Sequence, residues 1–185
     1  MRDYCGPNSL VEDFDVKLWL DISRKRHAAV VCALVKVLEA RNHHFVITSA
    51  NEDLFSHLSA ELAPHTVTIL TGSKSRGTLA RAFSAPMRVA RLASWARQHS
   101  FDLALCLDNP TQATSSRLIG LSVAALLENP SDRGSEILRR ASSFIGVPDY
   151  LTTRQMSDLN IAQSQIIWRY EDAPEAVYYD GFKST

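Results

Sequence analysis

The chain has 185 residues, of which 45% are hydrophobic and 22% charged, and its 20 basic and 20 acidic side chains give a net charge of zero. This length favours one domain, and the apolar content is too high for a disordered chain. Zero net charge disfavours a polycation that coats nucleic acid, so we expect no nucleic-acid partner.

The cysteines and the apolar runs bear on the cellular compartment. Cys5, Cys32 and Cys106 are odd in number and lack CxxC spacing, which argues against a disulfide framework and a structural zinc site. Residues 1–15 contain no apolar signal core, and no apolar run reaches the roughly 18 residues that a membrane span needs. We predict a loose leader over residues 1–15, no transmembrane segment and a cytoplasmic location.

Short apolar runs alternate with longer helical patterns along the rest of the chain. Strands are predicted at 16–22, 45–48, 66–70, 102–107 and 123–127, with weaker ones at 150–152 and 177–179. Helices are predicted at 27–41, 51–62, 78–99, 113–119 and 135–141. We expect Pro86 to break or restart the third of these helices, because proline lacks the N–H that a helix interior needs.

This alternation predicts the fold class. Strands joined through helices need crossover connections, which favour a parallel sheet covered by helices on both faces. The predicted fold is therefore an α/β domain, a Rossmann-like, three-layer, doubly wound parallel sheet.

Ligands of such sheets bind beyond the carboxyl ends of the strands. The candidate ligand-binding residues follow the predicted strands: Asp21, Ser23, Arg24, Asp108, Asn109, Glu128 and Asn129. Ser23 can cap the next helix, whose N-terminal N–H groups favour an anion, and Arg24 adds positive charge there. The alternative is a solvated basic turn, since most loops are polar.

His27 is the candidate catalytic residue, because it begins the first helix on the same side as these loops. It could act as a general base or bind a sugar hydroxyl. The alternative is a partly buried histidine whose hydrogen bonds are made by the backbone. The fingerprints GxGxxG and GxxxxGK[ST] are absent, which disfavours a standard dinucleotide or P-loop site. No residue pattern points to a bound metal or a cofactor.

One segment of the chain is strongly basic. No acidic residue lies between Ala63 and Phe101, whereas six basic residues do: Lys74, Arg76, Arg81, Arg88, Arg91 and Arg97. We predict Lys74, Arg76 and Arg88 as contacts for an anion or a phosphate. The alternative is a solvated basic face.

Four blocks occur in an order that carries a resemblance. They are residues 16–22 leading to His27, residues 39–48, residues 101–105 with Asn109-Pro110, Arg117 and Gly120-Leu121, and residues 179–183. In this order they resemble the amino-terminal half of the glycosyltransferase-like proteins of domain-of-unknown-function family 354, relatives of the two-domain GT-B enzymes. The stretch 101–120 is also similar to the heptosyltransferases, another GT-B family.

The resemblance implies both an architecture and a function. Residues 16–185 would form a GT-B N-terminal-type domain that binds the acceptor, with the C-terminal donor domain absent. Catalysis in such enzymes occurs in the cleft between the two domains and needs no bound metal. The expected function is therefore the acceptor-side half of a GT-B-like glycosyltransferase, or of another nucleotide-sugar-processing enzyme such as a 2-epimerase, incomplete alone.

The expected partners follow from this function. They are a sugar or nucleotide-sugar ligand and a complementary C-terminal domain or a homodimer partner. One alternative is a non-enzymatic α/β module that binds a small molecule or a protein. Another is a small-molecule enzyme of flavodoxin-like shape.

Overall fold

The computed structural model describes residues 16–25, 27–39, 43–49, 62, 66–69, 78–128, 133–161 and 164–170. Its strands are β1 (Lys17–Ile22), β2 (His44–Ser49), β3 (Thr66–Ile69), β4 (Leu103–Leu107), β5 (Ser122–Leu126), β6 (Phe144–Pro148) and β7 (Ile166–Tyr170). Its helices are α1 (His27–Glu39), α3 (Thr78–Arg97), α4 (Pro110–Leu118), α5 (Arg133–Ala141) and α6 (Thr153–Asp158).

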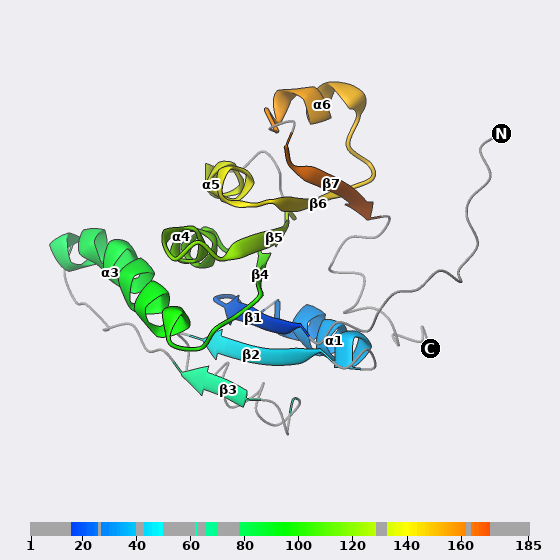
Figure 1. Ribbon diagram of the computed structural model, residues 1–185. Helices are drawn as coiled ribbons and strands as arrows, with labels where there is room; N and C mark the ends of the chain where they lie inside the picture. Colours follow the sequence, from blue (N-terminus) through cyan, green and yellow to red (C-terminus); the bar gives the residue numbers. More distant parts are fainter. Residues whose placement is uncertain are drawn as a thin grey trace, which may run out of the picture.

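The seven strands form one sheet in the order β3-β2-β1-β4-β5-β6-β7, and every neighbouring pair is parallel (Figure 1). Parallel neighbours require a crossover between successive strands, and helices α1, α3, α4, α5 and α6 lie in the crossovers that the structure describes. The predicted Rossmann-like α/β fold class is therefore confirmed.

Side chains on the two faces of the sheet form two hydrophobic cores. On one face Trp19 packs with Leu92 of α3, Ala113 of α4 and Leu138 of α5. On the other face Leu18, Leu20 and Ile22 pack with residues of α1, among them Ala28, Val31 and Val35. Successive side chains of a strand point to opposite faces, so β1 supplies both cores and the sheet lies between two helical layers.

Helix α3 runs continuously from Thr78 to Arg97 with Pro86 inside it, so the predicted break is wrong. Proline removes one hydrogen bond of the helix. Beyond Pro86, however, Leu92 and Ala96 are almost completely buried against the sheet. This packing keeps the helix in one piece. Helix α4 begins at Pro110, three residues before its predicted start, because Asn109 caps it.

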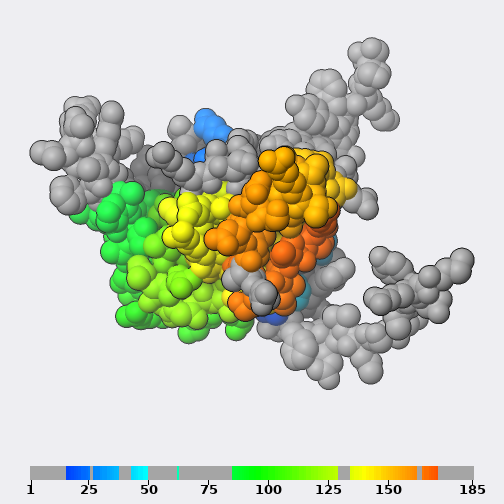
Figure 2. Space-filling view, turned by 90° about the horizontal axis from the view of Figure 1, so that it is seen from above, coloured from blue at the N-terminus to red at the C-terminus, as the bar shows by residue number. Residues whose placement is uncertain are grey.

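The far end of the sheet differs most from expectation. The predicted strand at 150–152 is wrong, because Thr152 instead forms a capping box with Gln155 at the start of α6. Strands β6 and β7 are not predicted, and they complete the sheet on this side. Figure 2 shows α5 in yellow and α6 and β7 in orange at this end of the molecule. The predicted helix at 51–62, except for Leu62, the predicted strand at 177–179 and the leader at 1–15 lie outside the described residues.

None of the described helices combines the length and apolarity needed to cross a membrane. The described residues also contain no group of three or more His, Cys, Asp or Glu side chains placed to hold a metal ion.

Candidate functional site

The candidate site lies at the carboxyl edge of the sheet, where the strand order reverses. Strand β1 has β2 on one side and β4 on the other. From β1 the chain first adds β2 and β3 on one side of the sheet, and then returns to add β4 to β7 on the other side. Open α/β sheets bind their ligands at such a switch point. The residues that follow β1, β4 and β5 therefore meet at the predicted place.

Asp21, near the end of β1, is the centre of a buried polar network. Its carboxylate accepts hydrogen bonds from Thr48 Oγ1 at 2.7 Å, from Arg88 Nη2 at 2.7 and 2.9 Å, and from Asn109 Nδ2 at 2.9 Å. The Asp21 side chain is completely buried. Buried charges need this density of partners, because burial removes the water that would solvate them. Asp21 therefore ties β1 to β2, α3 and the loop after β4.

Asn109 connects this network to the start of α4. Its Nδ2 also donates to the backbone oxygen of Asp21 at 2.7 Å, while its Oδ1 accepts from the backbone N–H of Gln112. The bond from the Gln112 N–H makes Asn109 the N-cap of α4, because it gives a hydrogen-bond acceptor to a backbone amide that has none within the helix. One buried amide thus fixes the position of α4 relative to the end of β1.

Thr48 and Gln112 belong to the same network, although they are not among the predicted site residues. Thr48 Oγ1 accepts from Trp19 Nε1 at 3.0 Å, and Gln112 Nε2 donates to the backbone oxygen of Trp19 at 2.8 Å. Both side chains are fully buried. Two sequence features could have identified them. Thr48 stands at the end of an apolar strand, and Gln112 lies in the first turn of a helix that begins with Asn-Pro.

Arg24 and Asp108 form a second ion pair at this edge, with Arg24 Nη1 2.9 Å from Asp108 Oδ2. The Arg24 side chain is 49% exposed, whereas that of Asp108 is 6% exposed. Asp108 has a backbone φ of 43°, in the left-handed region that non-glycine residues adopt at a cost in energy. The loop after β4 is therefore held in an unusual conformation beside an accessible cation.

His27 and Glu128 form a third pair, which joins the start of α1 to the end of β5. His27 Nε2 lies 3.0 Å from Glu128 Oε1, and the two side chains are 2% and 10% exposed. A carboxylate in this position orients an imidazole and selects its tautomer. The pair therefore lies just under the surface of the edge.

The remaining predicted site residues have different positions. Ser23 is exposed, and α1 begins only at His27, so Ser23 precedes the cap position and the expected cap is wrong. Backbone oxygens of Arg24 and Lys25 instead accept from the amides of His27 and Ala28. Arg88 does bind an anion, but that anion is Asp21 of the same chain. Lys74, Arg76 and Asn129 lie outside the described residues.

Cys106, on β4 beside this network, is fully buried. Burial raises the pKa of its thiol well above the ordinary value, and the negative charge of Asp21 raises it further. The side chain therefore stays a neutral thiol, which is a poor nucleophile.

Comparison with known proteins gives a fold relationship. No protein-family model and no curated protein sequence matches the chain. A UDP-N-acetylglucosamine 2-epimerase from Rickettsia bellii has a similar structure, with a TM-score of 0.66 and 10% identity over 91% of this chain and 48% of that one. The UDP-GlcNAc 2-epimerase from Neisseria meningitidis, bound to UDP-GlcNAc, gives 0.64 and 11% over 82% and 45%. A glycosyltransferase from Rickettsia africae gives 0.57 and 11% over 85% and 43%.

Identities this low show a shared fold and no more. The chain spans about half the length of the solved structures that it matches. Its Rossmann-like fold is therefore shared with part of the chain of each of these two epimerases and this glycosyltransferase. The finer resemblance to family 354 stays a prediction.

Proposed function

We propose that this chain is the acceptor-side half of a GT-B-like glycosyltransferase, or of another nucleotide-sugar-processing enzyme, and that it acts together with a donor-binding domain. The observation that carries the proposal is that two ion pairs, Arg24–Asp108 and Arg88–Asp21, and the His27–Glu128 contact gather at the ends of three neighbouring strands, at the switch point of the sheet. The fold shared with nucleotide-sugar enzymes over about half of their length supports it.

Under this proposal Arg24 makes the first contact with the ligand. Its guanidinium is half exposed and its partner Asp108 is nearly buried, so an incoming hydroxyl or phosphate oxygen can bind Arg24 from the solvent side. Asp108 and Ser23 would bind neighbouring hydroxyl groups. Lys74, Arg76 and Asn129 remain proposed contacts for phosphate and sugar.

Asp21 and Asn109 have another role in this proposal. Their polar atoms are buried and bonded to Thr48, Arg88 and Gln112, so they are positioning residues that hold the loops after β1 and β4. Binding groups held by a rigid network lose less entropy when the ligand arrives. Arg88 acts through Asp21 in the same way.

His27 is the proposed general base, and Glu128 is the residue that positions it. The imidazole would accept the proton of an acceptor hydroxyl while Glu128 stabilises the resulting positive charge. A histidine that is 2% exposed is shielded from bulk water, which strengthens its interaction with the carboxylate. Because Nε2 faces Glu128, Nδ1 is the nitrogen that would accept this proton.

The complete burial of Asp21 favours one other function, a non-enzymatic binding module. A carboxylate whose partners all come from its own chain contributes to rigidity without needing a substrate. In such a module Arg24 would still bind the ligand, while His27 and Glu128 would only join α1 to β5.

Calorimetric titration of the full chain with UDP-GlcNAc, UDP and N-acetylglucosamine tests the proposal. We expect at least one of them to bind, with the Kd of Arg24→Met raised about tenfold or more, because a direct charged contact is lost. Lys25→Met is the matched control, since Lys25 is the exposed neighbour of Arg24, and its Kd should stay within about twofold of the wild-type value.

Two results would overturn the proposal. One is the absence of binding for all three compounds up to about 10 mM, well above the range of specific ligands. The other is an equal Kd for wild type and Arg24→Met. Binding that depends on Arg24 but not on Glu128→Gln favours the binding module, whereas dependence on both favours the enzyme half.

A further inference from the structure

A cavity lies away from the carboxyl edge, between α4, α5 and the segment that leads from α6 to β7. Its volume is about 550 Å³, within the usual range for small-molecule pockets of roughly 300–1,000 Å³. The cavity reaches Arg117, near the end of α4, seven residues after the start of that helix at Pro110. At 1.5 Å per residue this places Arg117 roughly 10 Å along α4 from Pro110.

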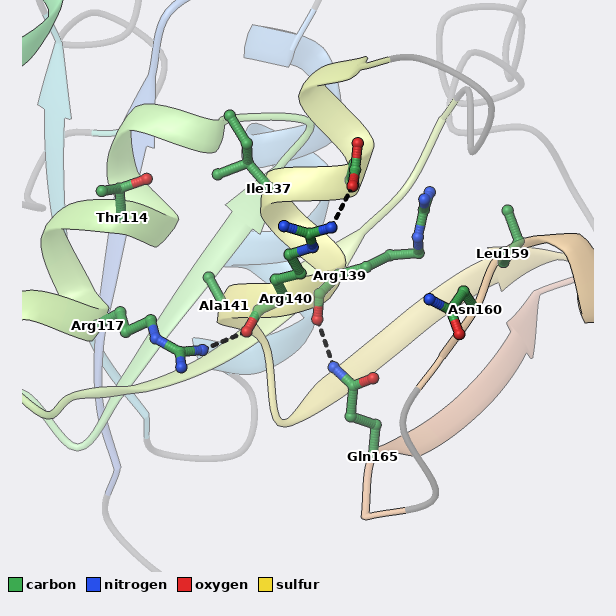
Figure 3. Close-up of a pocket in the computed structure, with 10 residues that line it drawn as sticks. Thr114, Arg117, Ile137, Arg139, Arg140, Ala141, Leu159, Asn160 and Gln165 are labelled. Carbon is green, nitrogen blue, oxygen red and sulfur yellow. Dashed lines mark hydrogen bonds and ion pairs between the residues drawn. The ribbon is translucent and has the colours of Figure 1, made fainter.

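The lining of this cavity is strongly cationic. Arg117 comes from α4, and Arg139 and Arg140 come from the last turn of α5 (Figure 3). Glu136 is the one acidic residue among the described residues that line it. Three guanidinium groups against one carboxylate leave an excess of positive charge around the cavity.

Two of these arginines make contacts within the chain that leave donors available. Arg117 Nη1 donates to the backbone oxygen of Arg140, and Arg140 Nη2 lies 2.5 Å from Glu136 Oε1. Each guanidinium carries five N–H groups, and these contacts use one nitrogen of each. Gln165 Nε2 donates to the backbone oxygens of Arg139 and Ser142, which anchors the wall that carries the arginines.

Arg139 is the least solvated of the three cations. Partial burial lowers the pKa of its guanidinium, and Arg140 lowers it further, against the opposite effect of Glu136. In Figure 3 its side chain extends away from that of Arg140, on the side of Leu159 and Asn160. A positive charge withdrawn from water gains most from an anion that enters the same cavity.

Positive charges at helix ends also have a simpler role, since they offset the negative end of the helix dipole. The helix dipole explains why each of α4 and α5, considered alone, has arginine in its last turn. It does not require arginines of two helices to line one cavity of this volume. Apolar groups of Ile137 and Leu159 in the same lining suit the body of an organic molecule.

We propose that this cavity binds the phosphate group of a small phosphomonoester, held by Arg117, Arg139 and Arg140. Three cations from two helices match the several oxygens of a tetrahedral dianion better than the two oxygens of a planar carboxylate. The site is separate from the carboxyl edge and does not depend on the proposed function.

Calorimetric titration of the full chain with glucose 1-phosphate, inorganic phosphate and glucose tests this site. We expect a phosphate compound to bind and glucose not to bind, and either Arg117→Met or Arg139→Met to raise the Kd about tenfold or more. Arg154→Met, an exposed arginine of α6 outside the lining, is the control and should leave the Kd within about twofold. Tight binding of glucose 1-phosphate identifies an organic ligand, and preference for inorganic phosphate identifies the free ion.

Glu136→Gln supplies a second measurement that does not remove an arginine. It takes away the one carboxylate of the described lining, so phosphate should bind about threefold or more tightly. The proposal is wrong if neither phosphate compound binds up to about 10 mM, or if Arg117→Met and Arg139→Met both keep the wild-type Kd within about twofold. UDP-GlcNAc binding in Arg139→Met should equal that of the wild type, which separates this site from the carboxyl edge.

Discussion

Arg88 Nη2, from the middle of α3, lies 2.7 Å from Oδ2 and 2.9 Å from Oδ1 of Asp21 near the end of β1. The two residues are 67 positions apart in the sequence, and their side chains are 17% and 0% exposed. This pair fixes the crossover helix α3 against the strand at the switch point. It is therefore the contact whose loss should disturb the carboxyl edge most.

Arg88→Met should lower the free energy of unfolding by about 3 kcal/mol, because it leaves a buried carboxylate with one partner fewer. Arg91→Met, one turn further along α3 at an exposed position, should change it by less than about 0.5 kcal/mol. Urea unfolding followed by circular dichroism measures both values.

The double variant Asp21→Asn with Arg88→Met identifies the cause of that loss. If the unpaired buried charge is responsible, removing it should recover part of the stability lost in Arg88→Met alone. A double variant that is less stable than Arg88→Met by the full cost of Asp21→Asn would instead mean that the two residues act independently.

Asn109→Asp should be less stable than Asn109→Ala at neutral pH, although aspartate is the better helix N-cap. In the Asp variant a carboxylate oxygen replaces the amide Nδ2 that lies 2.9 Å from Asp21 Oδ2, and two buried like charges would then face each other. We expect a difference of about 2 kcal/mol or more, measured by thermal unfolding. Equal stability of the two variants would mean that the cap outweighs the contact with Asp21.

Glu128→Ala should cost about 2 kcal/mol, because it removes the carboxylate from beside a buried imidazole nitrogen. The comparison is Glu136→Ala, whose pair with Arg140 has side chains that are 51% and 76% exposed. Solvent-exposed pairs of this kind contribute at most about 0.5 kcal/mol. Chemical unfolding of both variants gives the two costs. Similar losses would show that the His27 pair adds no more than a surface contact.

The strands at the centre of the sheet are predictable, because β1 and β4 are apolar runs buried on both faces. Strand β6 escapes prediction since its sequence contains Gly146 and Pro148, two residues that are rare inside strands. The structure explains the glycine. A Cβ at position 146 would lie 2.4 Å from Leu126 Cδ2 and 3.3 Å from Trp168 Cε3, so a larger residue would require the Leu126 side chain to shift.

The position of the candidate site can be predicted from the arrangement of parallel strands, whereas the pairing of its side chains cannot. Parallel strands bring the residues after β1, β4 and β5 to one edge, so Arg24, Asp108 and Glu128 are predictable as neighbours. Which cation meets which carboxylate depends on strand register and on how α3 packs. The sequence therefore predicts Arg88 as a contact for a bound anion, whereas in the folded chain Arg88 pairs with Asp21.

Cys106 predicts a pH effect on stability. Its pKa is raised in the folded chain by burial and by Asp21, so the folded state holds the thiol proton more tightly than the unfolded state. The stabilisation is complete below the unfolded pKa of about 8.5 and is lost as the pH rises above it, at up to about 1.4 kcal/mol per pH unit. Cys106→Ala removes the ionising thiol. Between about pH 8.5 and 10 the unfolding free energy of this variant should therefore fall less steeply than that of the wild type. Urea unfolding at several pH values measures both slopes, and parallel slopes would mean that the Cys106 thiol ionises as readily in the folded chain as in the unfolded one.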